Sequence, residues 1–274
     1  MAFANANDLH SYLVGTRFQF TYYFRSRRFV GLLIFSVLIT ALILFLDLHY
    51  NYSLYKSENS ADFLTAYFSS DITAYFAILA AFFGGDMVSM DLGTSTAYYT
   101  LVQPIRRSVL YIGRYTAAFL STAVLVLIIY LGGIAGSLYL YGNVSDLVLP
   151  SFGFALLYML ALISFATLFS AIFKTPSIGL VVSILFLLLV YPAVQGIISA
   201  LAGINPWMFV TYVGQMIYLV YEKNYTVHAV THTRFATIYT FNPTGNEAIL
   251  VMLGYIIVFL LISILVFTRK EIKG

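Results

Sequence analysis

The sequence predicts an all-α integral membrane protein with six transmembrane helices, and three observations lead to this fold class. Of the 274 residues, 61% are hydrophobic and 9% are charged, whereas a soluble domain carries about 25% charged residues. Long apolar runs recur along the chain, and a helix of about 20 apolar residues spans a bilayer. Lysines and arginines gather in alternate connecting segments, which is typical of a chain that crosses a membrane repeatedly. We therefore expect one membrane domain over residues 1–274.

Residues 8–28 precede the first apolar run and are expected to form an amphipathic helix in the inner membrane interface. At helical spacing Leu9, Leu13, Phe20 and Phe24 share one side, and arginines lie on the others, as in helices that rest among anionic headgroups. A plain basic leader that only orients the first span is the alternative. The first apolar run is long enough to stay in the membrane, so no cleaved signal peptide is expected.

Six apolar segments are predicted to span the membrane, namely 29–46, 63–85, 115–138, 149–173, 178–201 and 248–267. The uncharged stretch 175–221 is too long for one span, and "AGINPW" divides it. We expect residues 206–221, within an outer loop 203–247, to form a short helix that enters or lies on the outer leaflet. Counting this segment as a seventh span would move the basic tail to the outer side.

The distribution of basic residues predicts the orientation. With six spans and both termini in the cytoplasm, eleven of the 14 lysines and arginines lie inside, and only Lys56, Lys223 and Arg234 lie outside. This bias follows the positive-inside rule and predicts a multi-pass protein of the cell membrane. The sequons at Asn51, Asn143 and Asn224 then fall in outer loops, where glycans are attached.

Several kinds of chemistry are excluded by the sequence. The chain has no cysteine and no G-x-x-x-x-G-K-[ST] phosphate loop, so it should not hydrolyse ATP itself and is not expected to be an enzyme. His228 and His232 in "HAVTH" have ligand-like spacing, but no glutamate follows the first histidine. We interpret them as a surface pair and expect no metal site, no cofactor on this chain and no nucleic-acid partner.

Asp71 is the only acid inside an apolar segment. A carboxylate at that depth suggests a proton relay, a cation site or a cargo contact. The alternative is an N-cap of the helix that follows, close to the outer interface.

Two further features of the spans have structural and functional readings. Pro192 is expected to break the fifth span near its outer half, with Gln195 one turn beyond. This break could line a cargo path or form a packed kink. Gly132-x-x-x-Gly136 is expected to let a neighbouring helix approach closely.

The segment 89–104 between the second and third spans differs from a simple connection. Asp86 and Asp91 precede Gly93-Thr94, and Pro104-Ile105-Arg106-Arg107 closes the segment. Thr94 or Ser95 can cap a short helix and Pro104 can end it. We expect a helix of two to three turns that faces the cytoplasm and docks another protein.

The run "DMVSMDLGTSTAYYTLVQPIRRSVLYIGRYTAA" resembles the inner loop of permeases of the ABC type-2 exporter family. The matching positions are Asp91, Gly93, Thr94, Leu101, Pro104, Arg107, Gly113 and Arg114. The acid is Asp where the family more often has Glu, and "STAYYTLV" has fewer leucines than usual. The order of the segments along the whole chain is also similar to that family.

This resemblance implies a half-transporter that pairs with itself or with a related permease. It would dock on two separate ABC ATPase subunits, which bind ATP and Mg. Its short cytoplasmic coupling helix would contact the ATPase through Asp91, Gly93, Thr94, Pro104, Arg106 and Arg107. Residues 206–221 would resemble the re-entrant outer helices of such exporters.

The second and fifth spans would line the cargo path at the dimer interface. Candidate path residues are aromatic or polar and suit a hydrophobic or amphipathic cargo: Tyr67, Asp71, Tyr75, Tyr191 and Gln195. Two other functions stay open, an ion-coupled secondary transporter that uses Asp71 and a membrane scaffold that moves no cargo.

Overall fold

The computed structural model describes residues 7–50, 59–89, 106–173, 175–200, 202–222, 225–232 and 237–269. Within these residues, five helices are long and apolar enough to cross a membrane, and a bent helix pair makes a sixth crossing. The predicted all-α membrane fold is therefore confirmed.

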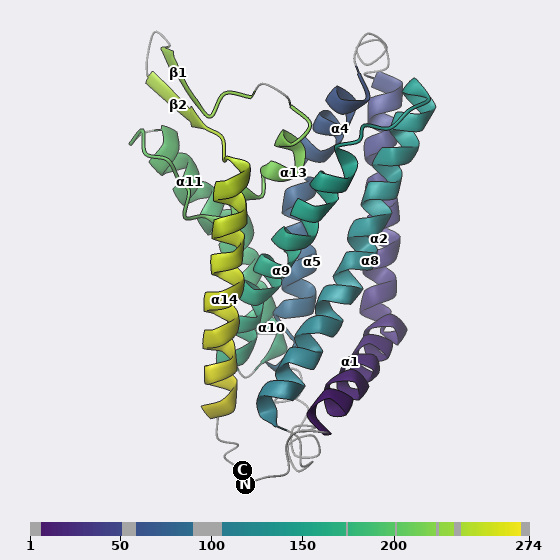
Figure 1. The fold of residues 1–274 in the computed structure, drawn as a ribbon, viewed down its shortest axis with the longest axis vertical. Helices are drawn as coiled ribbons and strands as arrows, with labels where there is room; N and C mark the ends of the chain where they lie inside the picture. The colour runs from purple at the N-terminus through teal and green to yellow at the C-terminus, as the bar shows by residue number, and fades with distance from the viewer. Residues whose placement is uncertain are drawn as a thin grey trace.

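The long helices form a bundle, and a two-stranded hairpin lies at one end of it (Figure 1). The helices and strands are α1 (Asn7–Arg25), α2 (Arg27–Tyr50), α4 (Ser60–Ser69), α5 (Ile72–Gly84), α8 (Arg107–Tyr141), α9 (Val148–Ile172), α10 (Pro176–Leu185), the π-helical turn η1 (Phe186–Val190), α11 (Tyr191–Ala200), α12 (Val210–Val213), α13 (Met216–Leu219), β1 (His228–His232), β2 (Thr237–Phe241) and α14 (Gly245–Arg269).

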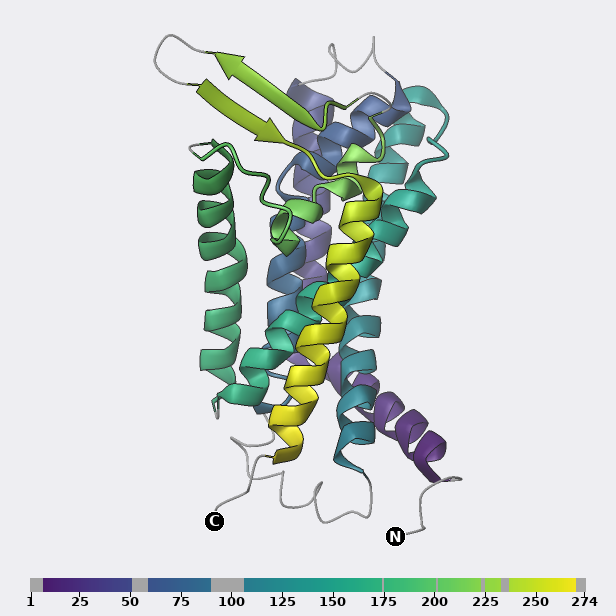
Figure 2. The same ribbon diagram turned by 60° about the vertical axis from the view of Figure 1, so that its left-hand side comes forward.

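The two ends of the bundle are formed by different elements. At one end, here called the α1 end, lie α1, the first turns of α8 and α10, and the last turns of α5, α9 and α14 (Figures 1 and 2). At the other, the hairpin end, lie α4, α13 and the two-stranded hairpin β1–β2. Figure 2 shows α10 and α11 as a column beside α14, with the hairpin above them.

The second span is not one straight helix. It consists of α4 and α5, which meet at an angle of 50°. The break lies at Asp71, whose φ of 57° places it in the left-handed region, a conformation that cannot continue a right-handed helix. Asp71 is exposed and holds the N-cap position of α5, but its carboxylate makes no capping hydrogen bond. Its position agrees with the capping interpretation, although the backbone turn and not the side chain marks the start of α5.

The fifth span continues through Pro192, where the sequence predicted a break. Pro176–Ala200 is a single helical span of 25 residues, and the π-helical turn η1 lies immediately before Tyr191 and Pro192. Proline supplies no N–H and its ring crowds the carbonyl one turn earlier. A π turn widens the helix at that point, so the proline is accommodated within the span.

Close packing of α8 against α2 and α4 confirms the prediction for the two glycines. A Cβ atom at Gly132 would overlap Cγ2 of Thr40, and one at Gly136 would lie 2.7 Å from Cδ2 of Leu44 and 2.8 Å from Cζ of Phe63. Lipid tails are as apolar as leucine, so helices in a membrane associate largely through such close contacts at small residues.

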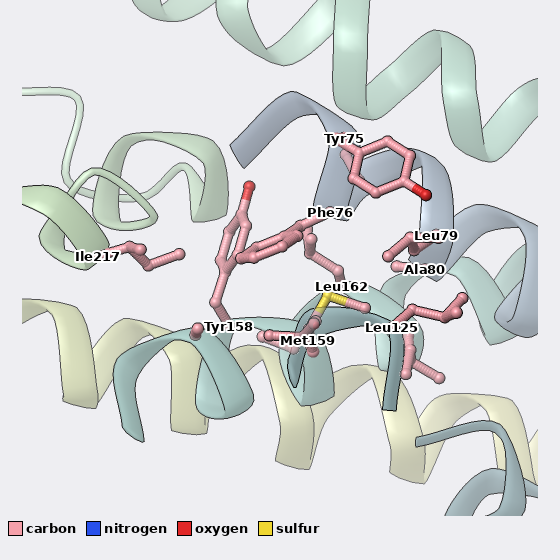
Figure 3. Close-up of a cluster of buried hydrophobic side chains, with 14 of the residues drawn as sticks. Tyr75, Phe76, Leu79, Ala80, Leu125, Tyr158, Met159, Leu162 and Ile217 are labelled. Carbon is pink, nitrogen blue, oxygen red and sulfur yellow. The ribbon is translucent and has the colours of Figure 1, made fainter. Parts of the chain in front are cut away.

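One part of the core lies where α5, α8, α9 and α13 meet. Figure 3 shows buried side chains of these helices gathered there, among them Tyr75, Phe76, Leu79, Ala80, Leu125, Tyr158, Met159, Leu162 and Ile217. Nearby, the hydroxyls of Tyr130 and Ser151 lie 2.7 Å apart, and Ser151 donates to the carbonyl of Ile217 at 2.6 Å. These bonds attach α13 to the bundle.

The hairpin end differs most from the prediction. Residues 206–221 contain two one-turn helices, α12 and α13, instead of one, and most of their apolar side chains are buried. The hairpin was not predicted at all. His228 pairs with Phe241 in the strand register, and their rings stack with centroids 4.7 Å apart. His228 and His232 thus begin and end one strand, where a separation of four residues amounts to roughly 13 Å.

We predict that Gly132→Leu destabilises the protein, because the added side chain must displace Thr40. Overpacking of a close contact costs about 1–3 kcal/mol, which should lower the unfolding temperature in detergent. Gly254→Leu is the matched control, because a Cβ atom there meets nothing within 4 Å. Equal unfolding temperatures for the two variants would contradict the packing assigned to Gly132.

Candidate functional site

The α1 end holds both flanks of the predicted docking loop. Asp91, Gly93, Thr94 and Pro104 lie outside the described residues, as does nearly all of the predicted coupling helix over 89–104. The structure describes the chain up to Ser89 and again from Arg106. The site is therefore built from the two segments that carry the loop.

The first flank, residues 84–89, is here called the loop base, and it begins with a tight backbone contact. A Cβ atom at Gly84 would lie 2.9 Å from Cβ of Ala166 in α9, and one at Gly85 would lie 2.9 Å from Cα of Leu180 in α10. A Cβ atom at Gly179 would overlap the carbonyl oxygen of Gly85. The end of α5 is thus packed on α9 and α10 at distances that only small residues permit.

A serine of α9 fixes the next residues of the loop base. The buried Oγ of Ser170 accepts hydrogen bonds from the backbone N–H groups of Val88 at 2.8 Å and Ser89 at 3.1 Å. The Oγ of Ser89 lies 3.3 Å from the same oxygen. Two backbone donors beyond the end of α5 are satisfied by one side chain of α9, which orients the chain as it enters the loop.

An ion pair connects the loop base to the first span. Nη1 of Arg28 donates to Oδ2 of Asp86, and the side chains are 61% and 6% exposed, respectively. Burial raises the pKa of Asp86 to about 6, although the charge and hydrogen bond of Arg28 act in the opposite direction. The carboxylate is thus buried just after α5, while the guanidinium is largely exposed.

Arg28 belongs to the elbow between α1 and α2, which packs on α5. The Oγ of Ser26 donates to the carbonyl of Tyr23 at 2.7 Å and accepts from the N–H of Phe29 at 3.1 Å, so it joins the two helices. The ring of Tyr23 meets Phe83 edge to face with centroids 5.2 Å apart. A small pocket beside Asp86 is lined by aromatic rings of α1 and α5 and by polar groups of the elbow.

The second flank is held by α1 and α14. Nη1 of Arg106 lies 3.4 Å from Oδ2 of Asp8 in α1, with the arginine side chain 60% exposed. An exposed pair of this kind contributes about 0–1 kcal/mol. Nη1 of Arg107 donates to the carbonyl of Thr268, near the end of α14, at 3.1 Å.

The start of α8 also packs along α1, in the segment where the sequence resemblance placed Gly113 and Arg114. A Cβ atom at Gly113 would lie 3.3 Å from Oγ1 of Thr16, and the hydroxyl of Tyr12 donates to Oγ1 of Thr116 at 3.0 Å. Arg114 is buried. Of the predicted docking residues, the structure therefore places Arg106 and Arg107 at the point where α8, α1 and α14 meet.

The predicted path residues do not form one group. Asp71 lies at the α4–α5 bend. The hydroxyl of Tyr75 is buried 2.7 Å from Oγ of Ser36 in α2, and Tyr67 is buried with its hydroxyl donating to the carbonyl of Ile129 at 3.0 Å. Both tyrosines lie inside the protomer, where their hydroxyls connect helices.

The two fifth-span candidates share a different environment. Tyr191 packs against Phe165 of α9 and Phe209, with ring centroids 5.2 Å and 5.4 Å away. Oε1 of Gln195 accepts from Oγ1 of Thr211 in α12 at 3.1 Å. These contacts attach the upper part of the fifth span to the segment containing α12.

The sequons can be placed only in part. Asn143 is exposed in the turn between α8 and α9 at the hairpin end, where its carbonyl accepts from Oγ of Ser137 at 2.9 Å. Asn51 and Asn224 lie outside the described residues.

Sequence reasoning did not assign a role to the contacts that hold the loop base. The sequence presents Asp86 as an acid before the loop, and Arg28 only as one of several basic residues. Ser170 and Gly179 were not noticed. The pair of glycines before Asp86, together with the isolated glycine in "TPSIGL", was the available signal, because small residues near span ends often indicate close helix contacts.

Comparisons with known proteins agree with the resemblance in the sequence. The family model described as ABC-2 family transporter protein matches residues 19–272. A search of curated proteins gave no match.

We predict that Ser170→Ala loosens the loop base. Two buried backbone N–H groups lose their acceptor, at a cost of about 1–3 kcal/mol for each unsatisfied group. Amide hydrogen exchange in residues 86–89 should accelerate, and the unfolding temperature in detergent should fall.

Ser121→Ala is the control for this prediction, because its buried hydroxyl bonds to the carbonyl of Ala117 one turn earlier in the same helix. If exchange in residues 86–89 is as slow in Ser170→Ala as in Ser121→Ala, Ser170 does not orient the loop base.

Proposed function

The chain belongs to the ABC-2 transporter family, and from this premise we propose that it forms a dimer that docks two separate ATPase subunits and exports a hydrophobic or amphipathic cargo. Membership makes the chain a membrane subunit of an ABC transporter, which is not itself catalytic and which works with an ATPase subunit. The finer statements, namely dimerisation, docking through residues 89–107, outward direction and type of cargo, are our proposal.

The observation that carries the proposal is the way both flanks of the loop are fixed at one end of the bundle. The loop base is held by Ser170 of α9 and Arg28 of α2, and the far flank by Thr268 of α14. A loop that only connected two spans would not need such contacts. Force applied to residues 90–105 would reach α5 and α8 directly, and their neighbours through these contacts.

The charge distribution supports a cytoplasmic position for the α1 end. The arginines of α1, the elbow, the start of α8 and the end of α14 all lie there: Arg17, Arg25, Arg27, Arg28, Arg106, Arg107, Arg114 and Arg269. By the positive-inside rule this end lies on the cytoplasmic side of the cell membrane, where an ATPase subunit can bind it. ATP and Mg would be bound by that partner, because this chain contains no phosphate loop.

The proposal assigns the cargo path to the dimer interface, beside the second and fifth spans. Only 17% of the apolar window of Pro176–Ala200 is buried within the protomer, so most of this span is available to lipid or to a second copy. Tyr191 and Gln195 are half-buried on it. Tyr75 is buried on α5 and would support the path wall from behind, and Asp71 would lie at its hairpin end.

The proposed mechanism uses no covalent chemistry on this chain. ATP binding closes the partner ATPase dimer and moves the docked loops. The rigid spans carry this motion to the interface and change the side to which the path opens. Membership of the ABC-2 family favours this mechanism over an ion-coupled carrier, and the exposed N-cap position of Asp71 gives that residue a structural role.

We predict that Asp91→Ala combined with Arg107→Ala abolishes co-purification of the partner ATPase, to be sought among the products of neighbouring genes, while membrane insertion is unchanged. The variant removes one predicted loop contact and one anchor of the far flank. The measurement is the amount of ATPase recovered per permease after affinity purification from detergent.

Lys223→Ala is the charge-loss control, because the sequence places Lys223 in the outer loop. If the ATPase is recovered equally with the double variant and the control, the role of the loop is wrong. If no ATPase is recovered with the wild-type chain, the exporter proposal fails as a whole.

We predict that Asp71→Asn leaves ATP hydrolysis by the reconstituted complex unchanged, with or without a proton or sodium gradient. Asparagine also tolerates the left-handed conformation, so the free energy of unfolding should stay within about 0.5 kcal/mol. Asp146→Asn, at another exposed acid of the hairpin end, is the control. Activity that requires a gradient and is lost only in Asp71→Asn would favour the ion-coupled carrier.

A further inference from the structure

The Arg28–Asp86 pair has a position that packing alone does not explain. Asp86 lies in the loop base, directly after α5, and Arg28 lies in the first turn of α2, 58 positions away in the chain. The pair therefore gives the elbow between α1 and α2 a charged contact with the segment that enters the docking loop. Ser170 and Gly179 hold the same segment from the opposite side, on α9 and α10.

The ion pair adds little to the free energy of folding. Burying the Asp86 carboxylate is unfavourable, and the attraction to a largely exposed partner need not repay that cost. Aromatic contacts already attach the elbow to α5, through Phe83 with Tyr23 and Phe29. An uncharged residue at position 86 would leave those contacts in place. The ion pair adds a directional link between a particular point of the elbow and a particular point of the loop base.

We propose that Arg28 and Asp86 are a positioning pair that makes the first span move with the docking loop. When the loop is displaced, the pair carries the α1–α2 elbow along with α5, so that α1, α2 and α5 move as one unit. Without the pair, the loop would still move α5 but would leave α2 behind. This inference rests on the proposed function, because it assumes an ATPase that moves the loop.

Protonation of the Asp86 carboxylate would weaken the ion pair with Arg28 without a substitution. The charged and titratable groups that face Asp86 among the described residues are Arg28 of α2 and the phenols of Tyr22 and Tyr23 of α1. Because the pKa of Asp86 is raised to about 6, the carboxylate is ionised at pH 7.5 and mostly protonated at pH 5. Its charge attraction to Arg28 is present above that pKa and is lost as the pH falls through it.

The absence of cysteine from the sequence allows a direct test. Spin labels are attached at Val30→Cys, at the start of α2, and Leu265→Cys, near the end of α14; the native side chains are 48% and 53% exposed. The complex with its ATPase is prepared with labelled chain diluted in unlabelled chain. Label-to-label distances are measured by double electron–electron resonance with and without a non-hydrolysable ATP analogue, at pH 7.5 and pH 5.

The test compares Asp86→Asn, Arg28→Lys and the exchanged pair Arg28→Asp with Asp86→Arg. Asp8→Asn is the matched control, because it removes a carboxylate of the α1 end that pairs with a different arginine, Arg106. In the wild-type complex we expect the nucleotide to shift the distance at pH 7.5 and to shift it much less at pH 5. Asp86→Asn should lose at least half of the shift at pH 7.5, with unchanged recovery of the ATPase and little dependence on pH. Arg28→Lys, the exchanged pair and Asp8→Asn should keep the shift.

Three results would overturn the inference. The first is a full nucleotide-dependent shift in Asp86→Asn. The second is loss of the ATPase or of the folded protein in Asp86→Asn with recovery in the exchanged pair, because this would assign the pair to docking or stability. The third is failure of the wild-type chain to recover an ATPase, which rejects the proposed function together with the inference. The third result is distinguished from the others because it needs no variant.

Discussion

The backbone contact between the end of α5 and helices α9 and α10 determines where the functional loop begins. In a bilayer, helices gain little from burying apolar side chains against one another, so their positions depend on small residues and internal hydrogen bonds. Gly84, Gly85 and Gly179 bring three helices into backbone contact at the α1 end. Ser170 and Arg28 can reach the loop base only because this contact places it within hydrogen-bonding distance. The glycines hold the base in place, and the polar groups orient it.

The two spans assigned to the cargo path both contain an interruption of regular helix. The second bends by 50° at Asp71, and the fifth contains a π-helical turn before Pro192. Each is fixed to the bundle near the α1 end through the Gly85–Gly179 contact. Above its π turn, α11 has no buried side chain. A lower part held by backbone contacts and an interruption of the helix above it would allow each span to change shape toward the hairpin end while its base stays attached to the loop.

The sequence was sufficient for the features that depend on composition and on local pattern. Hydropathy predicted the membrane fold, Gly132 and Gly136 predicted a close helix contact, and the loop motif identified the family. The hairpin was not predicted, because His228 to Phe241 is a short polar and aromatic stretch of the sequence without a clear alternation of apolar and polar residues. A proline within a span predicts an interruption of the regular α-helix but does not say which form it takes. At Pro192 the sequence predicted a break, and the structure has a π-helical turn. The bend at Asp71 depends on one backbone angle that Asp favours only weakly.

The contacts of the loop base could not be predicted for a different reason. Arg28, Asp86 and Ser170 come from three segments that are far apart in the chain, and only the helix packing brings them together. In the sequence, Asp86 is only one of two acids that precede Gly93-Thr94. Its burial, and with it the raised pKa, follows from tertiary structure alone.

The proposed transporter depends on binding of the partner ATPase to residues 89–107 at the α1 end. A photo-crosslinking amino acid placed at Thr94 tests it most directly, with the same probe at Val230 of the hairpin as the reference position. In the intact complex we expect crosslinks to the ATPase from position 94 and none from position 230. Crosslinks from position 230, or none from position 94 while the ATPase remains bound, would contradict the claim.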